Sequence, residues 1–240
     1  MFWPTKPYML LGMSHLVAIC EAMNNEQKEK FDIYDLNFSP KLYDKKKNTL
    51  NLAPLRGKTP KYLFLSVRGN FHNVFGLMEN PVRLAVGDAA RGVIPASSDR
   101  MFVPEDLFRE NMKAQLDQLS FSLLKILADH FTRSKIVHIA SPPPCGDEEH
   151  IRAYPGVFRP KLKYGISPAP LRRKIYDIHT KIYRDECARL GIGFLEAPAA
   201  AVDERGMMKR EFWCMDPTHG NALYGALVLE QIMALTGAVS

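Results

Sequence analysis

The segment PYMLLGMSH, residues 7–15, gives the strongest indication of the fold class. Its apolar run, YMLL, carries no charge and ends at Gly12, a pattern typical of a short strand that is buried on both faces. Four further short runs are rich in β-branched and aromatic residues. With residues 7–12 as the first strand, the sequence therefore predicts a five-stranded parallel sheet whose other strands are residues 31–36, 61–67, 135–140 and 193–196.

Longer stretches with a helical period separate these runs. Residues 104–132 repeat leucine and methionine at spacings of three to five, residues 169–190 are followed by a glycine, and a final helix follows Asp216. Strands that alternate with helices are typical of β-α units. The sequence thus predicts an α/β fold with helices on both faces of the parallel sheet.

The composition is that of an ordinary globular protein. The chain has 240 residues, of which 46% are hydrophobic and 24% charged. A chain of this length can bury a sufficient core without a metal or a disulfide, so we expect one domain over residues 1–240. Three irregular excursions, at about 38–60, 75–103 and 141–168, break the rhythm of this domain and are typical of functional loops or lids.

Charge and cysteine usage exclude several classes of protein. The net charge of +6 favours anionic partners only weakly and falls short of the dense basic face of a nucleic-acid binder. The four cysteines form no CxxC pair, which indicates free thiols rather than a zinc knuckle or a disulfide framework. The first apolar run is too short for a membrane span or a signal peptide. We therefore expect a cytoplasmic protein with no membrane or nucleic-acid partner.

Polar residues follow the first and third predicted strands and precede the last helix. Ser14 follows the first strand, and Asp216 and His219 stand before the helix. Because ligands bind at the carboxyl ends of parallel strands, these residues can meet at one edge of the sheet. A serine hydroxyl becomes a nucleophile when a histidine accepts its proton and a carboxylate orients the imidazole. The sequence predicts Ser14, His219 and Asp216 in these three roles.

An ester carbonyl under attack becomes an oxyanion, which needs hydrogen-bond donors aimed at it. The block Arg68-Gly69-Asn70 follows the third strand, so the Asn70 amide and the Ser14 backbone N–H are the predicted donors. Each of these residues alone also fits an ordinary helix cap or turn. Their order and combination carry the prediction.

These blocks resemble those of the SGNH (GDSL-like) hydrolases. The resemblance rests on Gly12-Met13-Ser14 at the end of the first strand, on Gly69-Asn70 after a later strand, and on Asp216 three residues before His219. It implies a flavodoxin-like three-layer α/β/α fold and an esterase-type activity that uses no metal or organic cofactor. By the same resemblance, the preferred substrate is a carbohydrate or related small molecule that carries a small acyl group such as acetyl.

Two positions depart from the family pattern. Met13 stands where the family has an aspartate before the serine, and residues 35–39 contain no glycine to match the family's second oxyanion donor. Since that donor is a main-chain N–H, we expect one from residues 37–39 to serve instead. Arg68 is also unusual, and we expect it to contact an anionic group of the substrate or product.

His15 and His72 lie near the predicted site in sequence. We expect them to contact the substrate or to support their neighbours rather than to act as a second base. Two alternatives to a serine esterase use the same residues: an O-acyltransferase, which excludes water from the site, and a non-catalytic domain that binds a glycan or an anion. The sequence predicts no oligomeric state.

Overall fold

A parallel five-stranded sheet forms the centre of the molecule in the computed structural model, which describes residues 6–87 and 99–237. Its strands are arranged in the order β2-β1-β5-β8-β9, and all four neighbouring pairs are parallel. The bounds are Phe31–Asp35 for β2, Tyr8–Gly12 for β1, Tyr62–Ser66 for β5, Lys135–Ile139 for β8 and Gly193–Leu195 for β9. Each predicted strand is thus confirmed to within one or two residues.

Side chains of the central strands alternate between two hydrophobic clusters. In β1, Met9 and Leu11 join one cluster, whereas Tyr8 and Leu10 join the other. Because successive side chains of a strand point to opposite faces, the two clusters lie on opposite faces of the sheet. This burial on both faces explains why the run YMLL contains no polar residue.

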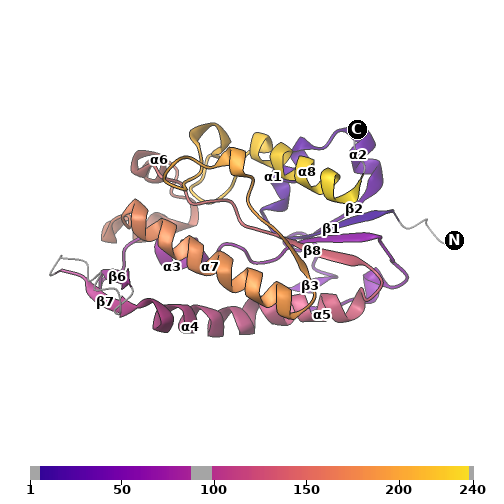
Figure 1. The fold of residues 1–240 in the computed structure, drawn as a ribbon, viewed down its shortest axis with the longest axis horizontal. Coiled ribbons are helices and arrows are strands. Elements are labelled where there is room, and N and C mark those ends of the chain that lie inside the picture. The colour runs from indigo at the N-terminus through magenta and orange to yellow at the C-terminus, as the bar shows by residue number, and fades with distance from the viewer. Residues whose placement is uncertain (1–5, 88–98, 238–240) are drawn as a thin grey trace.

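Helices cover both faces, so the molecule has three layers (Figure 1). On one face lie α1 (Leu16–Ala22), α2 (Asn25–Lys30) and α8 (Ala222–Thr236), and on the other α4 (Glu105–Leu116), α5 (Ser122–His130) and α7 (Ala169–Arg189). The short helices α3 (Phe71–Gly76) and α6 (Glu148–Ala153) lie beyond the carboxyl ends of the strands. The expected three-layer α/β/α architecture is confirmed.

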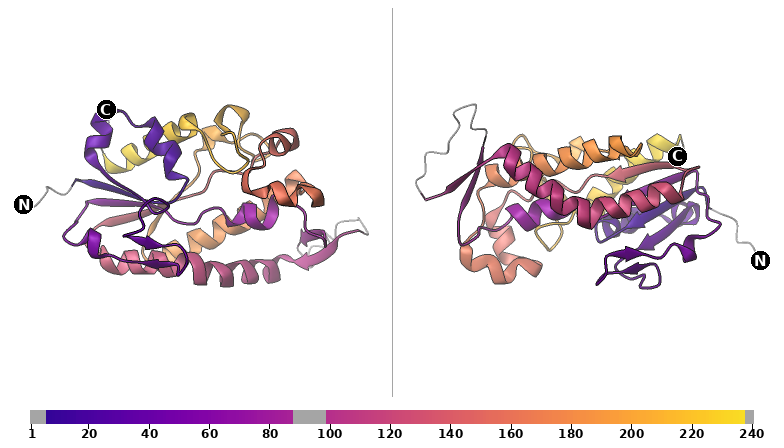
Figure 2. Two further views of the ribbon diagram at one scale, coloured as in Figure 1. Left: turned by 180° about the vertical axis from the view of Figure 1, so that it is seen from behind. Right: turned by 90° about the horizontal axis from the view of Figure 1, so that it is seen from below.

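A π-helical segment, Asp117–Phe121, joins α4 to α5. Figure 2 shows the three segments as one nearly continuous rod along the outer face, which agrees with the single helix predicted over residues 104–132. The last helix begins later than expected. Asn221 caps α8 by accepting hydrogen bonds from the backbone of Leu223 and Tyr224, so Asp216 and His219 lie on a turn before it.

The irregular excursions contain two small sheets that the sequence did not predict. Strands β3 (Tyr43–Asp44) and β4 (Thr49–Leu50) form an antiparallel hairpin within residues 38–60. Strands β6 (Leu84–Gly87) and β7 (Met101–Pro104) pair in parallel within the second excursion, of which residues 88–98 lie outside the described part. Among the described residues, no helix has the length and apolarity that crossing a membrane would require.

Candidate active site

The candidate site lies at the carboxyl ends of β1 and β5, the two central strands of the sheet. The chain after β1 runs to β2 on one side, whereas the chain after β5 runs to β8 on the other, so the strand order reverses between them. Such a reversal opens a crevice in which α/β proteins bind their ligands. Ser14 follows β1 and Asn70 follows β5, so both stand at this crevice.

Close backbone packing between the ends of β1 and β5 places Ser14 at the crevice. A Cβ atom on Gly12 would collide with the backbone of Ser66, so only glycine fits at the end of β1. The next residue, Met13, donates its N–H to the Ser66 carbonyl at 2.9 Å and fixes the turn into α1. The Ser14 hydroxyl then lies 2.8 Å from Nε2 of His219.

His219 is held by the turn that precedes α8. Its Nδ1 lies 2.8 Å from Oδ2 and 3.0 Å from Oδ1 of Asp216. The backbone N–H groups of His219 and Thr218 also donate to Oδ1 of Asp216, at 3.0 and 2.7 Å. The carboxylate thus organises its own turn and leaves Nε2 of His219 directed at Ser14.

The same hydrogen bonds keep Asp216 ionised. Partial burial works to raise the pKa of the Asp216 carboxyl, but the hydrogen bonds from His219 and Thr218 outweigh it and hold the pKa well below its usual value. A carboxylate that stays charged favours an imidazole with its proton on Nδ1. That tautomer leaves the Nε2 lone pair free to accept the serine proton.

His15 packs against His219, with ring centroids 4.8 Å apart. Both of its ring nitrogens are buried and have no hydrogen-bond partner. Burial, together with the neighbouring His219, lowers the pKa of His15 well below its usual value. His15 is therefore a neutral wall beside the His219 ring.

Asn73 orients the side chain of Asn70. Its Nδ2 donates to Oδ1 of Asn70 at 2.6 Å, so the Nδ2 of Asn70 is left without a partner among the described residues. Asn73 Nδ2 also lies 2.9 Å from Nε2 of His72, whose Nδ1 is 3.3 Å from the Gly69 carbonyl. The three side chains therefore form a chain of hydrogen bonds that ends at the free Asn70 amide.

His72 lies beneath the crevice, not in it. It is 2% exposed, and its burial lowers its pKa to about 3. The expectation that His72 contacts substrate therefore needs correction, because both nitrogens of this buried, neutral ring already form hydrogen bonds with Gly69 and Asn73. It supports Asn73 instead.

Two of the three main-chain donors expected from residues 37–39, those of Asn37 and Phe38, are already engaged. The Asn37 N–H donates to Oδ1 of Asp35 at 2.7 Å, and the Phe38 N–H donates to the Asp35 carbonyl at 3.1 Å. A tight turn after β2 therefore uses both groups. The Asn37 side chain, however, lines the crevice and forms no hydrogen bond within the described residues.

Arg68 enters the crevice from a left-handed backbone conformation, with φ of +49°. Its Nη2 donates to the Tyr43 hydroxyl at 2.5 Å and to Oδ1 of Asn48 at 3.1 Å. Both partners belong to the β3–β4 hairpin. The hairpin thus fixes the position of the guanidinium group.

A pocket of about 200 Å³ opens between these groups. It is lined by residues from the β1, β2 and β5 ends and from α3, which are Met13, Ser14, His15, Asn37, Arg68, Gly69, Asn70, Phe71 and Val74. Four of the predicted site residues line this pocket: Ser14, His15, Arg68 and Asn70. Its size suits a small ligand.

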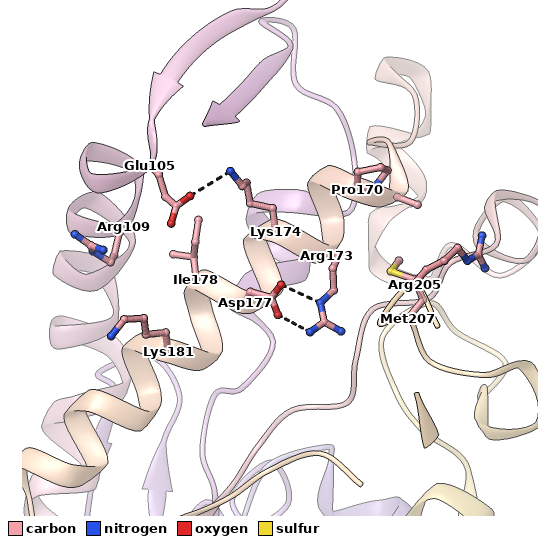
Figure 3. A pocket seen from close by; sticks show the side chains of 11 residues that line it. Glu105, Arg109, Pro170, Arg173, Lys174, Asp177, Ile178, Lys181, Arg205 and Met207 are labelled. Atoms are coloured by element: carbon pink, nitrogen blue, oxygen red, sulfur yellow. Dashed lines mark hydrogen bonds and ion pairs between the residues drawn. The ribbon is translucent and has the colours of Figure 1, made fainter. Parts of the chain in front are cut away.

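A larger groove, of about 720 Å³, runs between α4 and α7 (Figure 3). None of its lining residues belongs to the pocket around Ser14. Five of its eleven lining residues are cations. Four of these pair with acids: Arg173 with Asp177, Lys174 with Glu105, Lys181 with Asp185 and Arg205 with Asp203. No serine, cysteine or histidine lines the groove, so the smaller pocket is the candidate active site.

Across residues 6–87 and 99–237, no group of three or more His, Cys, Asp or Glu side chains could hold a metal ion. The segment Cys145–His150 has structural roles instead. Asp147 caps α6 by accepting the His150 N–H, and His150 Nε2 lies 3.0 Å from the Cys214 carbonyl.

No protein-family model matches the chain, and no curated protein matches it in sequence. Solved structures do match it. A Slackia heliotrinireducens protein, described as a candidate SGNH hydrolase, is 12% identical with a TM-score of 0.51, and the match covers 96% of this chain and 100% of that one. The chain has the SGNH hydrolase fold.

Two further structures are similar to this chain. A Streptococcus pneumoniae protein, described as a candidate platelet activating factor, has a TM-score of 0.52 at 14% identity, and the match covers 97% of this chain and 85% of that one. The periplasmic domain of a lipopolysaccharide acetyltransferase from Salmonella Paratyphi A has a TM-score of 0.52 at 11% identity, with 96% and 84% covered. The expectation of the SGNH hydrolase fold is thus confirmed.

Sequence reasoning missed four residues around this site on the SGNH hydrolase fold. Asn73 stands three residues after Asn70, a spacing that places both on one face of α3 and that could have revealed it. Thr218 lies inside the Asp216–His219 turn, and its backbone N–H donates to Asp216. No pattern in the sequence indicates this hydrogen bond. Tyr43 and Asn48 lie in an irregular excursion, and no pattern in the sequence connects them to Arg68.

Proposed function

We propose that this chain is a serine ester hydrolase that works through an acyl-enzyme intermediate. The observation that carries this proposal is the continuous hydrogen-bonded line from Ser14 through His219 to Asp216. It has the distances that activate a serine hydroxyl, 2.8 Å at each step. The likeness to SGNH hydrolase structures supports the same reaction.

In the first half of the reaction, Ser14 Oγ attacks the ester carbonyl carbon while its proton moves to Nε2 of His219. The tetrahedral intermediate then collapses, the bond between carbon and the alcohol oxygen breaks, and the alcohol leaves with the proton from His219. In the second half, water attacks the acyl-enzyme and gives a proton to His219. Collapse releases the acid and returns that proton to Ser14.

Donors around the pocket stabilise the oxyanion. The Ser14 N–H and the free Nδ2 of Asn70 are two of them, as the sequence predicts. We assign the third donor to the side-chain amide of Asn37, which stands after β2 where the resemblance expects a backbone donor. Its side chain lines the pocket and has no competing partner within the described residues.

The pocket of about 200 Å³ supports a small acyl group, such as acetyl, on a carbohydrate or related small molecule. Acyl transfer to a sugar hydroxyl in place of water is a second candidate, and the fold likeness to a lipopolysaccharide acetyltransferase domain supports it. Both reactions share the first half. The non-catalytic alternative gains no support, because simple binding does not require a hydrogen-bonded Ser-His-Asp line.

Turnover of p-nitrophenyl acetate tests the proposal. We expect wild type to release p-nitrophenol, and Ser14→Ala and His219→Ala to lose at least about 1000-fold in kcat. Ser122→Ala and His130→Ala, which remove the same side chains from exposed positions on α5, serve as matched controls and keep wild-type activity.

Covalent labelling gives an independent readout. A fluorophosphonate should add one label to wild type, located on Ser14 by peptide mass, and none to Ser14→Ala. A wild type that neither hydrolyses the ester nor reacts with the probe at high concentration contradicts the proposal. Turnover that survives in Ser14→Ala contradicts it as well.

A further inference from the structure

We infer that the active site takes an ester bearing an anionic group, a carboxylate or a phosphate monoester, which is bound by Arg68. This inference rests on the proposed function and names the class of its substrate. It is carried by the charge of the pocket, by the unused donors of the guanidinium group, and by the strained backbone that presents them.

Arg68 is the one formally charged side chain among the nine that line the pocket. Its hydrogen-bond partners, Tyr43 and Asn48, are neutral, and no acid pairs with it within the described residues. His15 adds no charge, because burial keeps its ring neutral. Four of the five cations of the larger groove have carboxylate partners, whereas no carboxylate pairs with the positive charge of this pocket within the described residues. An anionic ligand would compensate it.

The guanidinium group keeps donors free. Tyr43 and Asn48 engage only Nη2, and Tyr43 itself donates to Oδ1 of Asn48 at 2.8 Å. Nη1 and Nε of Arg68 make no protein hydrogen bond within the described residues, and Nε is also buried from solvent. A buried donor without a partner destabilises a protein, so an oxygen ligand that accepts a hydrogen bond from this group would be bound favourably.

Backbone strain holds Arg68 in this place. Arg68 and Asn48, with φ of +49° and +52°, are the only non-glycine residues with positive φ in the described part of the chain, and their side chains touch. Such conformations are strained in residues other than glycine, and they occur often at ligand-binding sites. Tyr183 holds the Arg68 turn by donating to the carbonyls of Val67 and Arg68, both at 3.0 Å.

The β3–β4 hairpin, which contains Asn48, is itself held by a contact with the segment between α4 and α5. Nδ2 of Asn48 donates to the Leu119 carbonyl at 3.0 Å, inside the π-helical segment between α4 and α5. A π-helical turn frees carbonyl groups from the regular helix pattern. Helix α7, the π-helical segment and the β3–β4 hairpin therefore together hold Arg68 in the pocket that Ser14 lines. An arginine that only faced solvent would not require these contacts.

Matched esters test the inference. For an anion on the acyl side, the pair is mono-p-nitrophenyl adipate and its neutral methyl ester, because the longer adipate chain does not favour attack of the carboxylate on its own ester. For an anion on the alcohol side, 3-acetoxybenzoate and 3-acetoxyphenyl phosphate are compared with 3-acetoxybenzamide. Each kcat/KM is divided by the rate of alkaline hydrolysis of the same ester, which removes differences in intrinsic reactivity.

We expect wild type to prefer at least one anionic ester over its neutral partner by about 10- to 100-fold, the effect of a hydrogen bond to a charged group. In Arg68→Asn most of this preference disappears, since asparagine tolerates positive φ but carries no charge. Tyr43→Phe, which keeps Arg68 but removes one contact that orients it, lowers the preference partly. Arg109→Gln, a cation of the larger groove, leaves it unchanged.

Two outcomes overturn the inference: a wild type that treats anionic and neutral esters alike, or a preference that persists in Arg68→Asn. The ranking of the two alcohol-side anions tells a carboxylate from a phosphate. If wild type hydrolyses no ester, the proposed function fails separately. Calorimetric titration with 3-hydroxybenzoate then decides, because weaker binding to Arg68→Asn supports the anion site and equal binding overturns it.

Discussion

Asn73 determines which end of the Asn70 amide faces Ser14. Its Nδ2 donates to Oδ1 of Asn70, and only a donor at this position selects the orientation in which the Asn70 nitrogen is free. The carbonyl oxygen of an amide in the opposite orientation would repel an oxyanion. Asn73 therefore acts through Asn70 as a positioning residue.

A double-mutant cycle tests this role. Asn73→Ala should lower kcat about 10-fold with little change in KM, because a misoriented amide weakens binding of the transition state more than binding of the ester. In the background of Asn70→Ala, the same change should cost almost nothing. Equal losses of kcat in both backgrounds would mean that Asn73 acts on the fold and not on Asn70. Asn111→Ala, on the exposed side of α4, is the control.

The blocks around Ser14, Asn70, Asp216 and His219 were predictable from sequence, because local order along the chain determines them. The structure brings these residues together, while their catalytic roles stay predictions until the variants are assayed. The third donor was not predictable. Whether the Asn37 N–H or its side chain is free depends on the turn made with Asp35, which no pattern in residues 35–39 indicates.

At the scale of elements, α1 begins just after Ser14 and α8 just after His219, the two residues joined by a hydrogen bond. They pack so closely that a Cβ atom on Gly225 of α8 would collide with the carbonyl group of Ala18 in α1. The helix that follows Ser14 and the helix that follows His219 are thus in backbone contact. The distance between these helices therefore sets the distance between the Ser14 hydroxyl and the His219 ring.

Gly225→Ala should therefore destabilise the protein, although alanine alone would favour the helix by about 1 kcal/mol. We expect the collision to cost more than this gain, for a net loss of about 1–2 kcal/mol in the free energy of unfolding and a lower kcat. Urea denaturation measures the first effect and ester turnover the second. Ala226→Gly, one residue further, should cost about 1 kcal/mol through helix propensity alone. A stabilised Gly225→Ala protein would contradict the close packing.

The five strands of the main sheet were predictable because both of their faces are buried, so that apolar residues run without interruption. The small sheets β3–β4 and β6–β7 were not, since strands of two to four residues carry too few side chains to show a period. The start of α8 was misplaced for a similar reason. Asp216 has the side chain of a helix cap but uses it to hold His219, and Asn221 caps the helix.

For the molecule as a whole, buried histidines should determine its stability in acid. His72, His138 and His179 are each 1–2% exposed. Burial lowers the pKa of His72 to about 3 and that of His138 to about 4, and it lowers the pKa of His179 well below its usual value. His72 and His138 are therefore neutral in the folded protein at pH 5, whereas they would be protonated in the unfolded chain.

A lowered pKa in the folded state means that the unfolded state binds more protons, so stability is present above the unfolded pKa of about 6.5 and is lost as the pH falls below it. We expect the free energy of unfolding to decrease by roughly 3 kcal/mol per pH unit between pH 6 and 5 from His72 and His138 together, about 1.4 kcal/mol for each, and the lowered pKa values of His179 and His15 add to this loss. Asp216 adds its own loss only below its unfolded pKa, at more acidic pH.

Urea denaturation at pH 8, 6 and 5 measures this dependence. His179→Phe should make the slope shallower, since one proton fewer is taken up on unfolding. Asn111→Ala, which removes no titratable group from the exposed side of α4, should leave the slope as it is. A free energy of unfolding that is flat from pH 8 to 5 would show that these side chains carry their protons inside the fold.

The hydrogen bond between Ser14 and His219 spans 205 positions of the chain. Proteins are synthesised from the amino end, so the ribosome releases β1 and Ser14 well before the His219 turn. A nascent chain therefore presents Ser14 and Arg68 before it contains the base that we propose. If the proposed function holds, esterase activity begins only after residue 219 has been released, and a chain interrupted before that residue does not react with esters.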